Sequence, residues 1–147
     1  MNKNIKEAYE SLEEDYMKIS KDYLALEESN IEAALIRHTS IYAFFSSVLT
    51  HAKRVKDLKS ITLETSEAKV MNTIREAALQ AGEKITQGAL NTYILMVPEL
   101  VELREEVVDA DTKYNLSKNI VSALDHQKDL LVQLSANKRA EMKLHEL

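Results

Sequence analysis

The sequence predicts an all-α protein of long antiparallel helices with coiled-coil character, packed as a helical bundle that is expected to be oligomeric. Three observations support this fold class. The 147 residues contain only two glycines and one proline, too few for many β-hairpin turns. Two long stretches repeat apolar residues at steps of three and four, as helices do. With 45% hydrophobic residues, the chain is long enough to bury a core as a single α-helical domain over residues 1–147.

Residues 1–29 predict an N-terminal, tyrosine-rich heptad helix. The narrow apolar stripe of such a helix, its seam, packs against one or two helices of the same chain or of another subunit. The pattern Ser29 to Glu32 resembles a capping box and predicts a break and a new helix start. We expect the seam residues to form an oligomer interface: Tyr9, Leu12, Tyr16, Ile19, Tyr23 and Leu26, which follow Ile5 in the same register.

Residues 30–97 predict a helical middle region with turns near 60–65 and 82–86. A broad apolar face predicts a helix over 31–59. The β-branched segment 60–63 weakens helix propensity and predicts a joint, after which Thr65 or Ser66 would cap a further helix. Gly82 suits the left-handed residue that follows a helix end, and Thr86 predicts the cap of a short helix over 87–96.

Residues 98–144 predict one long C-terminal helix. Pro98, the only proline, suits the first turn of a helix, and the residue before it is biased away from the helical region. A helix of this length would extend roughly 65 Å at about 1.5 Å per residue and needs partner helices along it. Its heptad stripe comprises Leu100, Leu103, Val107, Ala110, Tyr114, Ser117, Val121, Leu124, Lys128 and Leu131.

The net charge of −5 argues against a generally basic nucleic-acid binder, but the charge is unevenly distributed. Residues 1–36 carry nine acids against four bases, whereas residues 37–59 carry five bases against Asp57 alone. A local basic stripe is compatible with binding a polyanion. Cations at a solvated helix C-terminus, where they complement the helix dipole, produce the same pattern, so both interpretations stay open.

Recognisable catalytic patterns are missing from the sequence. It has no cysteine, no Gly-rich phosphate loop, no HExxH and no Glu-x-x-His motif of a di-metal bundle. We therefore expect no enzyme activity, no metal and no cofactor. No apolar run approaches the roughly 20 residues of a membrane span, so we expect no membrane partner and a cytoplasmic location, in the host cell if the protein is phage-encoded.

Two stretches resemble a known family. The first is a turn with Arg75, Gly82, Lys84 and Thr86. The second is a Leu-rich, basic helix end with Leu130, Leu131, Leu134, Lys138 and Arg139. Over about residues 31–142 they resemble the phage-encoded UvsY-type recombination mediators, which are small α-helical proteins. Residues 1–29 fall outside the resemblance.

The resemblance implies a homo-oligomeric accessory protein that binds single-stranded DNA (ssDNA). Such a mediator helps to load a RecA-type recombinase where single-strand-binding protein covers the strand. A basic groove repeated around an oligomer suffices for backbone-led ssDNA binding. The candidate DNA contacts are Arg37, Lys53, Arg54, Lys56, Lys59, Arg75 and Lys84. The alternative is a structural coiled-coil scaffold that acts only through protein–protein contacts.

Overall fold

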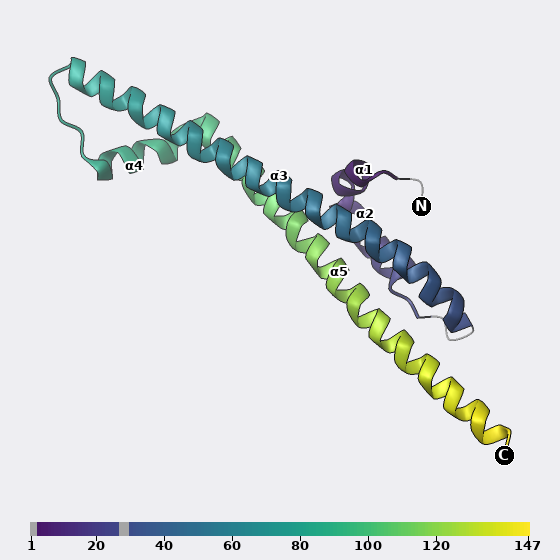
Figure 1. Cartoon of the computed structure of the whole chain (residues 1–147). Helices are drawn as coiled ribbons and strands as arrows, with labels where there is room; N and C mark the ends of the chain where they lie inside the picture. Colours follow the sequence, from purple (N-terminus) through teal and green to yellow (C-terminus); the bar gives the residue numbers. More distant parts are fainter. Residues whose placement is uncertain (1–2, 27–29) are drawn as a thin grey trace. The chain divides into compact units, whose positions relative to one another are not determined.

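The computed structural model describes residues 3–26 and 30–147, and within these residues it is all-α. Figure 1 shows the helices in chain order: α1 (Ile5–Glu10), α2 (Leu12–Tyr23), α3 (Ile31–Gln80), α4 (Gln87–Met96) and α5 (Pro98–His145). The described residues contain no strand. The predicted fold class is confirmed, and the predicted oligomeric state stays a prediction.

The chain groups into two compact units. Unit 1 comprises residues 1–52 and 113–147, and unit 2 comprises residues 53–112. Helices α3 and α5 contribute residues to both units, α1 and α2 belong to unit 1, and α4 belongs to unit 2. The prediction of a single domain stays a prediction.

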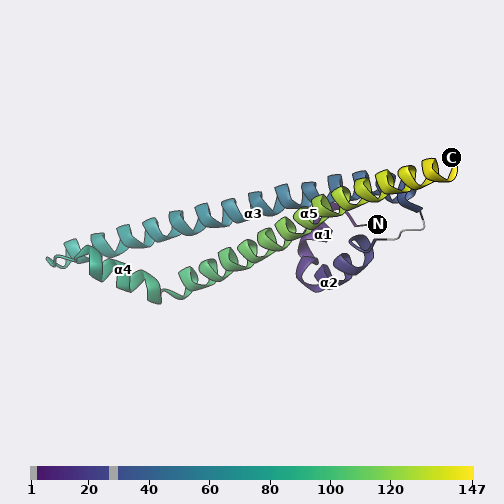
Figure 2. The same ribbon diagram turned by 90° about the horizontal axis from the view of Figure 1, so that it is seen from below.

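In unit 1, α1 and α2 pack beside the first part of α3 (Figure 2). Tyr9 of α1 meets His51 of α3 edge to face, with 5.1 Å between ring centroids, and Tyr23 of α2 meets Phe45 at 5.8 Å. The buried His38 binds across to α5, with 2.7 Å between its Nε2 and the carbonyl oxygen of Leu124. Since a carbonyl oxygen only accepts, Nε2 carries the proton in this bond. These contacts build a core from three segments that are far apart in the sequence.

In unit 2, ion pairs show that α3 and α5 run antiparallel. Lys56 pairs with Asp111, and Glu67 pairs with Arg104, so rising numbers on α3 meet falling numbers on α5. The Arg104 guanidinium also donates to the carbonyl oxygen of Ile94 in α4, at 3.0 Å. One arginine therefore ties all three helices of this unit together.

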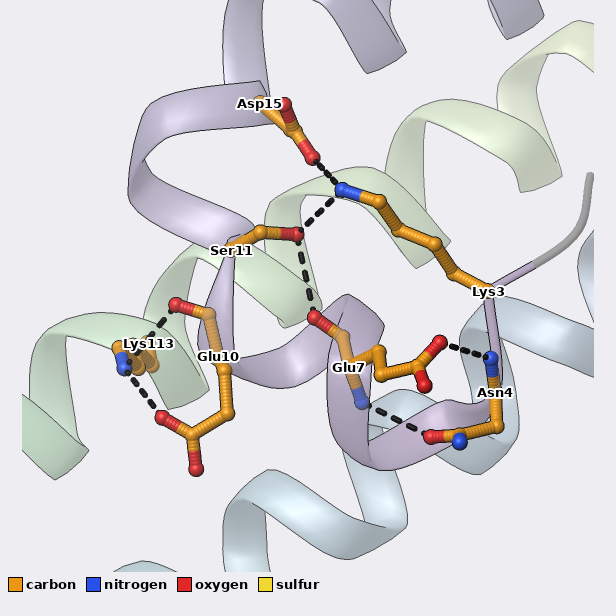
Figure 3. Close-up of polar contacts among 7 residues, drawn as sticks. All are labelled: Lys3, Asn4, Glu7, Glu10, Ser11, Asp15 and Lys113. Atoms are coloured by element: carbon orange, nitrogen blue, oxygen red, sulfur yellow. Dashed lines mark hydrogen bonds and ion pairs between the residues drawn. The ribbon is translucent and has the colours of Figure 1, made fainter.

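The predicted continuous heptad helix over residues 5–26 is wrong, because the chain bends at Ser11 and α2 ends at Tyr23. Figure 3 shows the polar contacts at the bend. The Ser11 hydroxyl donates to the carbonyl oxygen of Glu7 at 3.1 Å and accepts from Lys3 Nζ at 3.0 Å. Serine side chains compete in this way with the regular backbone bonds of a helix. A capping box between Asn4 and Glu7, absent from our prediction, starts α1.

The predicted joint near residues 60–65 is also wrong, because α3 continues as one helix from Ile31 to Gln80. Each β-branched residue costs only a few tenths of a kcal/mol in a helix. The Thr62 hydroxyl binds the carbonyl oxygen of Leu58 at 2.9 Å, inside the helix. Contacts to α5 on both sides, from Lys59 and Glu67, hold the segment in place. Tertiary packing therefore outweighs local propensity here.

The two ends of α3 follow known capping rules. At the start, the Asn30 side chain accepts from the backbone N–H of Ala33, so Asn30 takes the capping role; Ser29 lies outside the described residues. At the end, Gly82 has a φ of 71°. The N–H of Glu83 donates to the carbonyl oxygen of Ala78, and that of Gly82 to Leu79. This is the Schellman arrangement, and it confirms the predicted turn after α3.

The predictions for α4 and α5 are confirmed. The Thr86 side chain accepts from the N–H of Ala89 and caps α4, and Val97 is extended before Pro98 starts α5. Most of the heptad stripe of α5 is buried or half-buried, and Lys128 is exposed. Within the described residues, no helix combines the length and apolar character needed to cross a membrane.

Candidate nucleic-acid interface

Four of the predicted DNA-binding cations are exposed and lie on α3: Arg75 near its end, and Arg37, Lys53 and Arg54 earlier in the helix. Arg37 belongs to unit 1, while Lys53 and Arg54 are neighbours at the start of unit 2. No carboxylate of the described residues lies within ion-pair distance of these three side chains. Lys53 and Arg54 are therefore available to an anionic ligand.

Two other predicted cations have acidic partners inside unit 2. Lys56 lies 2.6 Å from the carboxylate of Asp111, and Lys59 pairs with Glu106. Both of these acids are on α5. Each pair cancels a positive charge that a phosphate would otherwise meet. The basic run also lies in the interior of α3, so an explanation through the dipole at a helix end is wrong.

The predicted residues of the turn region lie in unit 2 as well. The Arg75 guanidinium donates to Gln87 Oε1 at 2.7 Å and so bridges the end of α3 to the start of α4. Lys84 is exposed in the segment between these two helices. Arg75 therefore has a local structural role, whereas the Lys84 ammonium makes no hydrogen bond or ion pair with the described residues.

Charge in unit 2 limits the size of any phosphate-binding surface. Residues 53–112 contain eight basic and eleven acidic side chains. With Lys56 and Lys59 paired, the strongest remaining cationic feature of the predicted set is the neighbouring pair Lys53 and Arg54. The sequence alone presents Lys53, Arg54, Lys56 and Lys59 as one basic stripe. A count of charges along one segment does not include the acidic partners on α5.

The predicted oligomer-interface residues pack largely within unit 1. Tyr9, Leu12 and Ile19 are buried, Tyr16 and Tyr23 are half-buried, and Leu26 is exposed. The ammonium of Lys113 on α5 lies 4.8 Å from the centre of the Tyr9 ring and 3.7 Å from the Glu10 carboxylate; Figure 3 shows the Glu10 contacts. The chain thus covers much of this seam itself, and its role as an interface between subunits stays a prediction.

Sequence reasoning missed Arg104 and Lys113, which join helices within unit 2 and unit 1 respectively. The sequence signal that could have found them is a single basic residue placed within an acid-rich or apolar stretch of a predicted helix. In the described ranges 3–26 and 30–147, no three His, Asp or Glu side chains gather as a metal site would require. No family model, curated protein or solved structure matches the chain.

Proposed function

We propose that this protein is a recombination mediator of the type that its sequence resembles: a helical accessory protein that binds ssDNA and helps to load a RecA-type recombinase. One observation carries the DNA-binding part of the proposal. Lys53 and Arg54 are adjacent, exposed and have no carboxylate at ion-pair distance among the described residues. Phosphate contacts need such cations and little further geometry.

A site of this size binds weakly in one chain. Two or three cations displace few counterions from a single strand, so useful affinity depends on repeating the site in an oligomer. Arg37, Arg75 and Lys84 are the further exposed cations of the predicted set, and Arg75 is engaged with Gln87. Lys56 and Lys59 contribute little, because Asp111 and Glu106 already neutralise them. The proposal therefore centres on Lys53 and Arg54.

The test is fluorescence anisotropy of a labelled ssDNA oligonucleotide at about 50 and 200 mM salt. The variant Lys53→Ala/Arg54→Ala is expected to weaken binding and to reduce the salt slope by about 1.4, since each lost phosphate contact on a single strand contributes about 0.7. The matched control is Lys6→Ala/Lys69→Ala, which removes the same charge at two other exposed positions.

An equal loss of ssDNA affinity in the two variants would contradict the proposed site, because the loss would then depend on net charge alone. A folded wild-type protein that fails to bind ssDNA at about 50 mM salt would contradict the function. Recombinase loading is then tested by strand-exchange kinetics in the presence of single-strand-binding protein.

The second candidate is a scaffold that acts through protein–protein contacts. Unit 2 favours it by exposing many large apolar side chains on all three of its helices. Leu95, Val101 and Val108 among them line one groove, and contiguous exposed apolar surface marks interaction sites. Binding that hardly responds to salt would distinguish this function from phosphate binding. The exposed residues are Leu58, Ile61, Leu79, Tyr93, Leu95, Met96, Val101 and Val108.

A further inference from the structure

The first part of α5 has an exposed face that the heptad stripe does not use. Val101 and Val108 lie seven residues apart, about two helical turns, and are 38% and 63% exposed. Together with Leu95 of α4 they line a groove in unit 2 whose other walls are Arg104, Glu105 and Asp109. Arg104 is engaged with Glu67 and with the Ile94 carbonyl. Among the described residues, the charged groups of this groove that have no ion-pair partner are the Glu105 and Asp109 carboxylates, spaced i, i+4.

The last part of α5, in unit 1, has an exposed face of opposite charge. Val132 is 52% exposed, and Ala136 and Ala140 are exposed at the following positions of the same face. Arg139 and Lys143 border a shallow depression with these alanines and Glu146. Neither cation has a carboxylate within ion-pair distance among the described residues, and Arg139 Nε donates to the carbonyl oxygen of Ser135. The two cations are also spaced i, i+4.

The two faces complement each other in charge, spacing and size. Small alanines on one helix allow close approach to the valines of the other, and an antiparallel crossing brings Lys143 to Glu105 and Arg139 to Asp109. Pairs of opposite charge at matching intervals set the register of helix contacts, and an amphipathic helix in an apolar groove is a common recognition mode. We propose that the C-terminal face of α5 in one chain docks into the α4–α5 groove of a second copy.

This contact is heterologous, because each chain offers two different surfaces. Repetition of the contact leads to a closed ring or to an open filament, depending on the rotation between neighbours. The inference goes beyond the proposed ssDNA binding and uses none of its residues. It places self-association at surfaces that are exposed, rather than at the seam of residues 9–26.

The test is a charge exchange followed by sedimentation velocity without DNA, with chain concentrations up to about 100 µM, in the range where weak interfaces form. The groove variant is Glu105→Lys/Asp109→Lys, and the tail variant is Arg139→Glu/Lys143→Glu. Wild type is expected to assemble as concentration rises. Each variant is expected to raise the dissociation constant at least tenfold, because like charges then face each other. Circular dichroism checks that each variant keeps its helices.

The decisive samples are combinations. A mixture of the two variants, and one chain carrying all four changes, each restore opposite charges across the contact and are expected to recover assembly. A wild-type chain that stays monomeric would overturn the proposal and leave the groove to a basic helix of another protein. Assembly that neither variant weakens would overturn it too, as would folded single variants that dissociate while both combinations fail to recover. The proposed ssDNA binding is measured separately by anisotropy, so a failure of this contact and a failure of ssDNA binding are distinguishable. A monomeric wild type would leave only the weak binding that Lys53 and Arg54 give in one chain.

Discussion

At the residue scale, the bend between α1 and α2 depends on a small polar cluster. Lys3 Nζ contacts both the Ser11 hydroxyl and the Asp15 carboxylate (Figure 3). The hydrogen bond from the Lys3 ammonium is the main cause that holds the pKa of Asp15 below its ordinary value of 3.8. Lys3 therefore ties the segment that precedes α1 to the start of α2 through an ion pair on the surface.

The lowered pKa of Asp15 predicts a pH dependence with a definite sign. The ionised carboxylate stabilises the fold above pH 3.8, its ordinary pKa, and this contribution is lost as the pH falls through the lower native pKa. In an NMR titration we expect the Asp15 midpoint to lie below 3.8 and to rise in Lys3→Ala. Lys6→Ala, which removes a neighbouring exposed cation, is the control. Equal midpoints in wild type and Lys3→Ala would contradict the cause.

His38 shows how one buried polar group is satisfied across helices. Its Nε2–H donates to the Leu124 carbonyl oxygen, and its ring stacks on Tyr42 with 6.0 Å between centroids. We expect His38→Leu to lower the free energy of unfolding by about 1 kcal/mol, the net worth of a typical hydrogen bond. Urea unfolding followed by circular dichroism measures this difference. Tyr42→Phe, which leaves the bond intact, is the control and is expected to have the smaller effect.

At the element scale, the two glycines have opposite roles. Gly82 ends α3 with a φ of 71°, a conformation that L side chains rarely adopt, whereas Gly88 lies within α4. A Cβ atom at either position would meet no atom within 4 Å. Any difference between the two alanine substitutions therefore comes from the backbone alone.

We predict that the two substitutions shift stability in opposite directions. Gly82→Ala is expected to lower the free energy of unfolding by about 1 kcal/mol or more, since the left-handed conformation strains a residue with a Cβ. Gly88→Ala is expected to raise it by up to about 1 kcal/mol, because alanine is the better helix former. Chemical denaturation of both variants and of wild type measures the two changes in the free energy of unfolding. Stabilisation by Gly82→Ala would contradict the assigned helix end.

At the scale of the whole molecule, the buried core is unevenly distributed. Unit 1 buries most of the large apolar side chains, while the last turns of α5, from residue 136 on, are exposed. In unit 2 the buried apolar residues are few, namely Leu90, Ile94, Leu100 and Ala110. The surfaces that the chain does not cover itself are therefore concentrated in unit 2 and at the end of α5.

This distribution predicts a pattern of amide hydrogen exchange. In the monomer, amides of residues 136–145 are expected to exchange faster than those of residues 117–131, because few packed side chains hold the last turns. If the end of α5 docks into a second copy, protection of residues 136–143 rises with protein concentration in wild type. In the Arg139→Glu/Lys143→Glu variant, the protection of these amides stays low at every protein concentration. Slow exchange of these amides at the lowest concentration would contradict the unpacked end.

The sequence by itself determined the helical class, the helix ends at Gly82, Thr86 and Pro98, and the buried stripe of α5. These features depend on local chemistry: backbone conformations that few residue types adopt, and apolar spacing along one helix. Tertiary structure decided the bend at Ser11, the unbroken course of α3 through residues 60–65, and the neutralisation of Lys56 and Lys59. Each of these depends on partners tens of residues away or on a side-chain bond that competes with the helix. The contacts of α3 with α5 arise only when the two helices meet, so a local apolar or charge pattern cannot show them. The bend at Ser11 was missed because a heptad pattern counts apolar positions and does not include the bonds of a serine hydroxyl.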